Sequence, residues 1–480
     1  SKVIKFKLSK TNFILLNIFI FLIIIVRSIY LYDVVKNREV FFELIIAFLS
    51  SILSLVPFTL SWYKFGRPRL TDWVKFSTFL YLILNYYLVS DKFYLKDVGI
   101  YGEVYVNISY IYDTLVVIFV GLLTINIIDL VFLVINFKNV KNTASLKLDS
   151  TYVLRNEKIF IYLSIISMVL SYFLLLTGLI GYGADGEAAS GSYSFLIQII
   201  NYFSPLFYFT YVIIKFMSGN NSKLFSNSFK LYNILYIIFG LVAGMKGILI
   251  FGIVLFLIPF LASGRGIPLK VIIPLALFLI ILYPFNSNYR EALTNTNSKV
   301  TAMQIAAVKT INIDFSGSLN ENTNSYSDRI SMFSYLLFSV EKEPDWNFYK
   351  NMERFVYLPV SMVPRILIPS KPAEENGAHL QQMIVRGVRN SPTPTVYGWA
   401  YLEGGVIFVF LHVAILSIVL NIIQFLPFKG SMFYFIFYSQ VLIKSIIIEQ
   451  DVYFFIATLF QMIFVYYFFS KIFFKKVISK

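Results

Sequence analysis

The sequence predicts an all-α polytopic membrane protein with about twelve transmembrane helices. Hydrophobic residues make up 58% of the 480-residue chain, and charged residues make up only 14%. A soluble protein of this length needs roughly 25% charged residues to cover its surface. The apolar residues also stand in continuous runs of about 20, which is the length that an α-helix needs to cross a bilayer.

The apolar runs give the predicted spans in chain order. The stretch 231–262 is too long for one span, because a single helix of that length would reach roughly 48 Å at 1.5 Å per residue. The sequence Gly-Met-Lys-Gly at 244–247 interrupts it. We therefore expect two short helices there, joined by a tight turn that exposes Lys246. The other expected spans lie near 12–30, 41–62, 73–90, 111–136, 159–181, 194–216, 269–285, 398–424, 432–449 and 452–470.

Basic residues predict the orientation. The net charge of +15 comes largely from lysines and arginines in alternate loops and at both ends of the chain. Since basic residues gather on the cytoplasmic side, we expect both termini to be cytoplasmic. The chain then divides into an N-terminal transmembrane bundle at 1–285, a large periplasmic loop at 286–397 and C-terminal transmembrane helices at 398–480. Charge of this kind gives no reason to expect nucleic-acid binding.

Two segments of the loop show a helical apolar stripe. Residues 299–313 place Val300, Met303, Ala307 and Ile311 on one face, and residues 330–340 do the same with Ile330, Phe333, Leu337 and Val340. Helices with one apolar stripe beside a membrane are typical of the interface plane, so we expect both to lie there.

The loop also carries basic residues on the side where few are expected. Pro364 and Pro369 stiffen the chain around Arg365 and would hold its guanidinium in place. Arginine suits phosphate because its planar fork offers paired donors and stays charged. The alternative is a solvated loop whose basic residues pair with nearby acids. Our candidate phosphate ligands are Arg365, Arg290, Arg329, Lys246, Lys371, Arg386 and Arg389.

Two residues are candidate general bases. His379 lies in the loop close to two glutamates, and Glu403 stands at the outer end of a predicted span. We interpret the other histidine, His412, as a helix-packing residue inside that span. Lys444 and Glu449 fall on one late predicted helix, where they could pair only loosely.

Several other chemistries find no support in the sequence. The chain has no cysteine, which removes thiolate metal sites and cysteine nucleophiles. It has no Gly-rich nucleotide loop and no His or carboxylate spacing typical of a metal site. We therefore predict a metal-independent mechanism without a cofactor.

Three short motifs resemble those of the polymerases of O-antigen and related bacterial polysaccharides (the Wzy type). Residues 364–372 read Pro-Arg-x-x-x-Pro-x-Lys-Pro, and residues 393–404 read Thr-Pro-Thr followed by Gly-Trp-Ala-Tyr-Leu-x-Gly as a span begins. The Gly-Met-Lys-Gly turn at 244–247 is similar to a Gly-Ser-Arg turn of that family. Lys246 replaces the expected arginine, and Trp399 and Glu403 stand where other residues are more usual, so the identity of the base stays open.

The resemblance implies a GT-C-like glycosyltransferase in the bacterial inner membrane, with its active site on the periplasmic side. Its substrate would be undecaprenyl-pyrophosphate-linked oligosaccharide repeat units, which it would join into a polysaccharide such as O-antigen. It would need neither a nucleotide sugar nor a metal, and a chain-length regulator protein is an implied partner. Two alternatives stay open, namely a lipid-linked oligosaccharide flippase and an O-antigen ligase.

Overall fold

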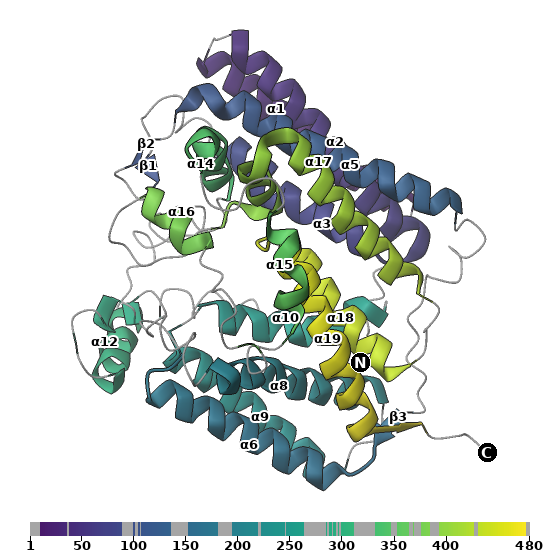
Figure 1. Ribbon diagram of the computed structural model, residues 1–480, viewed down its shortest axis with the longest axis vertical. Helices are drawn as coiled ribbons and strands as arrows, with labels where there is room; N and C mark the ends of the chain where they lie inside the picture. The colour runs from purple at the N-terminus through teal and green to yellow at the C-terminus, as the bar shows by residue number, and fades with distance from the viewer. Residues whose placement is uncertain are drawn as a thin grey trace.

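In a computed structural model of the protein, the residues that are described are almost entirely helical (Figure 1). The structure describes residues 10–35, 38–88, 99–100, 104–105, 107–135, 152–180, 194–218, 222–244, 246–263, 285, 288–289, 291–293, 296, 299–311, 332–346, 353–363, 368, 376–384, 393–426 and 431–476. Its helices are α1 (Lys10–Val35), α2 (Arg38–Phe65), α3 (Leu70–Thr78), α5 (Ile111–Ile135), α6 (Glu157–Leu176), α8 (Ser194–Ile213), α9 (Lys223–Val242), α10 (Lys246–Ser263), α12 (Lys299–Ile311), α14 (Phe333–Lys342), α15 (Glu353–Met362), α16 (Asn376–Ile384), α17 (Thr395–Phe425), α18 (Met432–Ile446) and α19 (Val452–Phe473).

Short elements complete the described chain. Two π-helical turns extend α3 and α8, namely η1 (Phe79–Ile83) and η4 (Ile214–Ser218), and two 3-10 turns are η2 (Ile108–Tyr110) and η5 (Glu343–Asp345). Strands β1 (Gly99–Ile100) and β2 (Val104–Tyr105) pair antiparallel. Strands β3 (Tyr152–Leu154) and β4 (Phe474–Lys476) also pair antiparallel, although more than 300 residues separate them in the chain.

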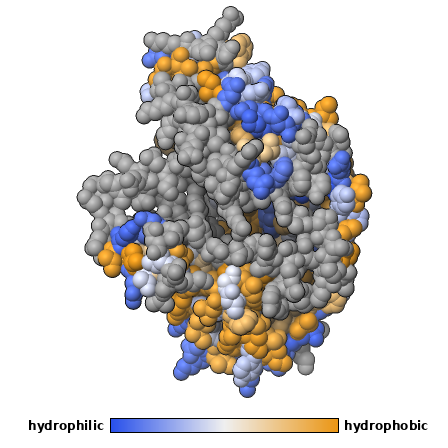
Figure 2. Space-filling view, turned by 60° about the vertical axis from the view of Figure 1, so that its left-hand side comes forward, coloured by the Kyte–Doolittle hydropathy of each residue, from blue (hydrophilic) through white to orange (hydrophobic). Residues whose placement is uncertain are grey.

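The fold is that of a polytopic membrane protein. Among the described residues, seven helices are long and apolar enough to cross a bilayer. Large apolar side chains on these helices face outward, for example Ile135, Leu176 and Ile407. Figure 2 shows apolar residues gathered over the lower part of one face, with hydrophilic residues above and below them. Such an apolar surface fits a lipid solvent and would be unusual in water. The spanning helices are Thr11–Val35, Val40–Phe65, Ile108–Ile135, Glu157–Leu176, Lys223–Val242, Thr395–Phe425 and Val452–Phe473.

The helices form two groups that meet at α18. In Figure 1, α1, α2, α3, α5 and α17 lie in the upper group, and α6, α8, α9 and α10 lie in the lower group. Helix α18 packs against α3 on one side and against α10 on the other, and α19 packs beside α18. One hydrophobic core runs through both groups.

The extramembrane elements gather mostly at one end of the bundle. Strands β1 and β2 and helices α12, α14 and α16 lie there, and we call it the insertion end (Figure 1). The backbone N–H of Asn107 donates to the carboxylate of Glu341 in the last turn of α14, and the hydroxyl of Tyr289 donates to the carbonyl of Val242 at the end of α9. The paired strands β3 and β4 lie at the opposite end. The two ends therefore differ in the amount of polar structure that they carry.

The predicted break in 231–262 is present, but the two helices are not short. Helix α9 begins at Lys223, where Ser222 accepts a hydrogen bond from the N–H of Phe225 and caps the helix. Gly244 has a φ of +64°, which ends the helix, and α10 begins at Lys246. Each helix is thus long enough to cross most of a membrane. The predicted span 269–285 lies almost wholly outside the described residues, so the count of twelve remains a prediction.

Helix α14, which the sequence predicts to lie in the membrane interface with one apolar stripe, is instead buried within the protein. Helix α14 packs against α17 and α5, and the side chains of Phe333, Leu336, Leu337, Phe338 and Val340 are buried. It is part of the protein interior because it has apolar residues on more than one face. Helix α12 buries Ala302 and Ala306 against Tyr289 and Ala292, whereas Met303 and Ala307 of the predicted stripe are only partly buried.

Candidate functional site

Helix α17 is broken in its first third. The helix has 31 residues, so it would extend roughly 46 Å if it were straight, well beyond the ~30 Å hydrocarbon core. Gly405 has φ 72° and ψ −157°, a conformation that is open to glycine and strained for other residues. Figure 1 shows the resulting bend near the insertion end. The segment 395–403 before the break is buried on nearly all sides, whereas lipid-facing side chains begin at Val406. Irregular backbone at membrane depth is tolerated where protein covers it.

Glu403 is the last residue before this break, and its carboxylate belongs to a hydrogen-bonded group. Tyr453 of α19 donates its hydroxyl to Oε2 of Glu403 over 2.8 Å. The same hydroxyl lies 3.1 Å from Nε2 of His412, and that nitrogen lies 3.5 Å from Oε2 of Glu403. All three side chains are buried, with exposed fractions of 1–3%. We call Glu403, His412 and Tyr453 the acid cluster.

Helix α15 covers the acid cluster. The ring of Phe355 lies 4.3 Å from that of Tyr453 and meets it edge-on, and it also contacts His412. The guanidinium of Arg354 stacks over the Tyr453 ring at 5.1 Å and forms an ion pair of 2.9 Å with Asp451. Asp451 in turn caps α19 by accepting from the N–H of Phe454. Contacts among α15, α17 and α19 therefore hold the cluster in place.

Helix α15 also runs beside α19. Its first turn is tied to Asp451 at the start of α19, and its last turn is tied to Gln461, whose side chain donates to the carbonyl of Ser361. Ten residues of α19 separate the two contacts, which is roughly 15 Å of helix rise. Part of the polar insertion is therefore packed against a membrane helix and does not stand clear of it.

The turn between α18 and α19 anchors the buried segment of α17. The carbonyl of Ile448 accepts from the N–H of Val396, and the carbonyl of Glu449 accepts from the indole N–H of Trp399. The sequence predicts Lys444 and Glu449 on one helix, and this is wrong. Helix α18 ends at Ile446, so Glu449 lies in the turn that follows it. These bonds fix the position of 395–403 and so of Glu403.

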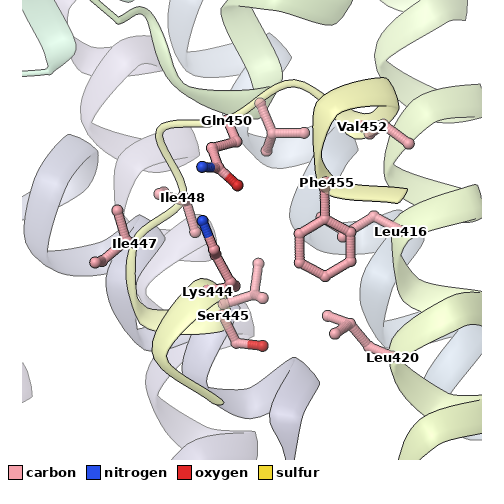
Figure 3. A pocket seen from close by; sticks show the side chains of 11 residues that line it. Leu416, Leu420, Lys444, Ser445, Ile447, Ile448, Gln450, Val452 and Phe455 are labelled. Atoms are coloured by element: carbon pink, nitrogen blue, oxygen red, sulfur yellow. The ribbon is translucent and has the colours of Figure 1, made fainter. Parts of the chain in front are cut away.

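A small cavity lies beneath that turn (Figure 3). The ammonium of Lys444 and the amide of Gln450 point into it from one side, and Leu416, Leu420 and Phe455 wall it on the other. Two residues that line the cavity are close to the acid cluster in the chain. Leu416 lies one helical turn after His412, and Phe455 lies two residues after Tyr453. Lys444 lies over the ring of Phe454 at 6.0 Å.

A second buried polar group lies toward the opposite end of α17. Asp129 of α5 accepts from Lys75 over 2.5 Å and from Arg69 over 3.1 Å, and Asp72 pairs with the same two cations at 3.3 and 3.0 Å. Asn421 of α17 donates to Asp129 over 2.8 Å. We call Arg69, Asp72, Lys75 and Asp129 the charge-balanced cluster, because it contains two charges of each sign. It joins α3, α5 and α17.

The sequence-predicted site residues are only partly within the described structure. Glu403 lies in the acid cluster. His379 stands on α16, with its ring 5.2 Å from that of Trp346 at a steep angle, and is half-buried. Lys246 is the first residue of α10, at the insertion end. The candidates outside the described residues are Arg290, Arg329, Arg365, Lys371, Arg386 and Arg389.

Two partners of Glu403 were not predicted from the sequence. We interpreted His412 as a packing residue, but it is hydrogen-bonded within the acid cluster. Tyr453 was not considered at all. The usable signal was polarity, since ionisable residues inside membrane spans usually have a function or a specific partner. In the part of the chain that the structure describes, no three His, Asp or Glu side chains are placed to hold a metal ion together.

Comparison with known proteins gives one family. A family model described as a domain of unknown function, DUF8712, matches residues 152–478. No curated protein and no solved structure matches the chain. The match starts at β3 and ends just after β4. The first and last strands of the matched region therefore pair with each other. It contains the whole acid cluster. The charge-balanced cluster, by contrast, belongs to α3, α5 and the turn before α3, which precede the match.

Proposed function

Because the chain belongs to the DUF8712 family, a domain family of unknown function, we propose its activity from the acid cluster and its setting. The protein is a polymerase, that is, a glycosyltransferase that joins undecaprenyl-pyrophosphate-linked oligosaccharide repeat units into O-antigen or a similar surface polysaccharide. It works at the periplasmic face of the bacterial inner membrane, with both termini cytoplasmic. The sequence motifs at 364–372 and 393–404 supply the resemblance on which the substrate class depends.

One observation carries the proposal: a buried carboxylate stands at a break in a membrane helix, at the end of the bundle that bears the polar insertion. Broken helices at membrane depth are a recurrent way to build sites for polar substrates within a bilayer. A transferase of this kind needs a base for the acceptor hydroxyl beside the membrane. Glu403 has the chemistry and the position for that role.

The remaining roles follow from the reaction. The acceptor hydroxyl attacks the anomeric carbon of the donor sugar, and the bond to the pyrophosphate oxygen breaks with its electron pair. Negative charge therefore grows on the pyrophosphate, and cations aimed at it lower the barrier. Arg365 is our first choice for that task, with Arg290, Arg329 and Lys246 as helpers and Lys371, Arg386 and Arg389 nearby in sequence. His379 is the alternative base.

The rival functions lead to different cell phenotypes. A flippase is expected to show two related halves and charges that line a path through the spans. An O-antigen ligase would use the same donor but a lipid A acceptor. In a deletion strain, loss of a polymerase leaves a single repeat unit on lipid A. Loss of a flippase or a ligase leaves none, and accumulation of lipid-linked units on the outer side of the membrane then identifies the ligase.

A point variant tests the phosphate-binding role. Arg365→Ala is expected to leave the protein in the membrane while long polysaccharide disappears from the banding pattern of the cell envelope. Lys309→Ala is the matched control, because Lys309 is a basic residue of the same insertion whose exposed side chain pairs with Glu291. Normal chain length in the Arg365 variant would remove that arginine from the proposal.

A further inference from the structure

Tyr453 bridges the two titratable side chains of the acid cluster. Its hydroxyl has one proton and lies within hydrogen-bond reach of both Oε2 of Glu403, at 2.8 Å, and Nε2 of His412, at 3.1 Å. The three groups therefore form a continuous chain along which a proton can move in short steps. A carboxylate that only removed a proton from a substrate would not require this second and third member.

His412 is suited to the end of such a chain. Its Nδ1 is buried and has no hydrogen-bond partner among the described residues. In histidine, the hydrogen bond of one ring nitrogen normally decides which nitrogen holds the proton. Since no described residue accepts from or donates to Nδ1, that nitrogen can carry the ring proton, and Nε2 can then accept the proton of Tyr453. The rings of Phe355 and Phe408 pack against the histidine ring at steep angles and keep it in place.

The charged residues around these three groups do not oppose the transfer of a proton from Glu403 to His412. From α19 and the turn before it come Tyr453 and Asp451, and from α15 come Arg354 and Glu353. Arg354 and Asp451 neutralise each other at 2.9 Å, and Glu353 is exposed to solvent. On α17 itself the titratable members are Glu403 and His412. Among the residues that the structure describes, the immediate surroundings of the cluster thus add no large net charge of either sign.

We propose that Glu403 passes the proton of the acceptor hydroxyl through Tyr453 to His412. This inference rests on the proposed function. As the new glycosidic bond forms and the pyrophosphate leaves with its electron pair, the hydroxyl proton moves to Glu403. Glu403 gives that proton to the oxygen of Tyr453, which gives its own proton to Nε2 of His412. Glu403 is then a carboxylate again and His412 an imidazolium, so charge is conserved. The reverse transfer releases the proton to water through Glu403 after the product has moved.

The relay would explain why the base is buried. A buried acid that kept the proton would have to wait for water before it could act again. With His412 as a store, Glu403 regains its basic form while the site is still closed around the sugar. Tyr453 and His412 are therefore positioning and relay residues, and Glu403 alone touches the acceptor.

The test uses the purified full-length protein in lipid vesicles. The substrate is the pool of lipid-linked repeat units extracted from a deletion strain. His412→Gln keeps a hydrogen-bonding group near the Nε2 position but cannot take up a proton, and Tyr453→Phe removes the bridge. We expect both to lower kcat roughly 10- to 100-fold at unchanged KM, at or below the lower end of the range for acid–base groups. Tyr434→Phe is the control, because its buried hydroxyl donates to the carbonyl of Ile423 in another region.

The outcomes separate the relay from the proposed function. A wild-type protein that leaves the units at their original length overturns both. A wild-type protein that lengthens them, together with a His412→Gln variant of normal kcat, overturns the relay alone. If either variant fails to reach the membrane, the wild-type rate in mixtures of light and heavy water decides. Two protons in flight give a curved dependence on deuterium content, and a straight line contradicts the relay.

Discussion

The two buried polar clusters lie toward opposite ends of α17, and they differ in how their charges are compensated. In the charge-balanced cluster, each of two carboxylates lies within 3.3 Å of both Lys75 and Arg69. In the acid cluster, a single carboxylate is held by a tyrosine hydroxyl and a histidine. No lysine or arginine forms an ion pair with Glu403 in the described part of the chain.

This difference assigns the clusters different roles. Buried ion pairs are costly to break because the partner left behind is a buried charge with nothing to compensate it. The charge-balanced cluster is thus suited to fixing α3, α5 and α17 in one arrangement. A carboxylate with neutral partners is held in place but can still exchange a proton, which is what acid–base chemistry requires. The charge-balanced cluster should govern stability, and the acid cluster should govern activity.

Replacement of the lone carboxylate should have the largest effect, and it should be on activity. Glu403→Gln keeps the size of the side chain and its contact with Tyr453 but removes the base. Polymer synthesis should fall roughly 10²- to 10⁴-fold, as expected for loss of an acid–base group. The rate of lengthening of extracted lipid-linked units measures this. The free energy of unfolding in mixed micelles should change little, and a large loss of stability would contradict the contrast between the clusters.

Loss of one cation from the charge-balanced cluster should act in the opposite way. Lys75→Met leaves two buried carboxylates with only Arg69, which should cost about 3–5 kcal/mol of stability. The free energy of unfolding in mixed micelles measures the effect. The control is Lys309→Met, because the Lys309–Glu291 pair is exposed and such pairs contribute about 0–1 kcal/mol. Equal effects of the two substitutions would mean that burial does not matter here.

A double variant sharpens the assignment. Lys75→Met combined with Asp129→Asn removes one charge of each sign and leaves Arg69 with Asp72. The double variant should be more stable than the sum of the single effects predicts, by roughly 0.5–3 kcal/mol, which is the range for residues in one network. Strict additivity in the same unfolding measurement would show that Lys75 and Asp129 act independently, against the 2.5 Å contact.

The break in α17 gives a smaller expected effect on stability than the loss of Lys75 does. Gly405→Ala places a Cβ on a residue with a φ of +72°, at a cost of roughly 1–2 kcal/mol. Gly178→Ala is a matched control, since Gly178 ends α6 with a φ of +76° and likewise has open space for a Cβ. Both should lose similar stability, but only Gly405→Ala should slow polymer synthesis, because it moves Glu403. Equal activity of the two variants would show that the break serves packing alone.

Particular residues show how far the sequence could lead. Apolar runs located α1, α2, α5, α6 and α19, and glycine at 244 marked the junction of α9 and α10. Glu403 was found as a candidate because it is ionisable and stands at the start of a span. Tyr453 was not found as a partner of Glu403, because 50 residues separate the two in the chain. His412 is on the same helix as Glu403, but residues nine apart in a regular helix face opposite sides, and only the break at Gly404 and Gly405 brings the two together.

The sequence by itself determined that this chain is a membrane protein of helices, because lipid offers no partner for exposed backbone polar groups and helices satisfy them internally. It also determined where several of the helices begin and end. Only the tertiary structure decided which polar side chains meet. A span that is apolar on all faces has no stripe that points to its neighbour. The rotation of α17 and α19, and the burial of α14 against α17 and α5, therefore had to come from packing.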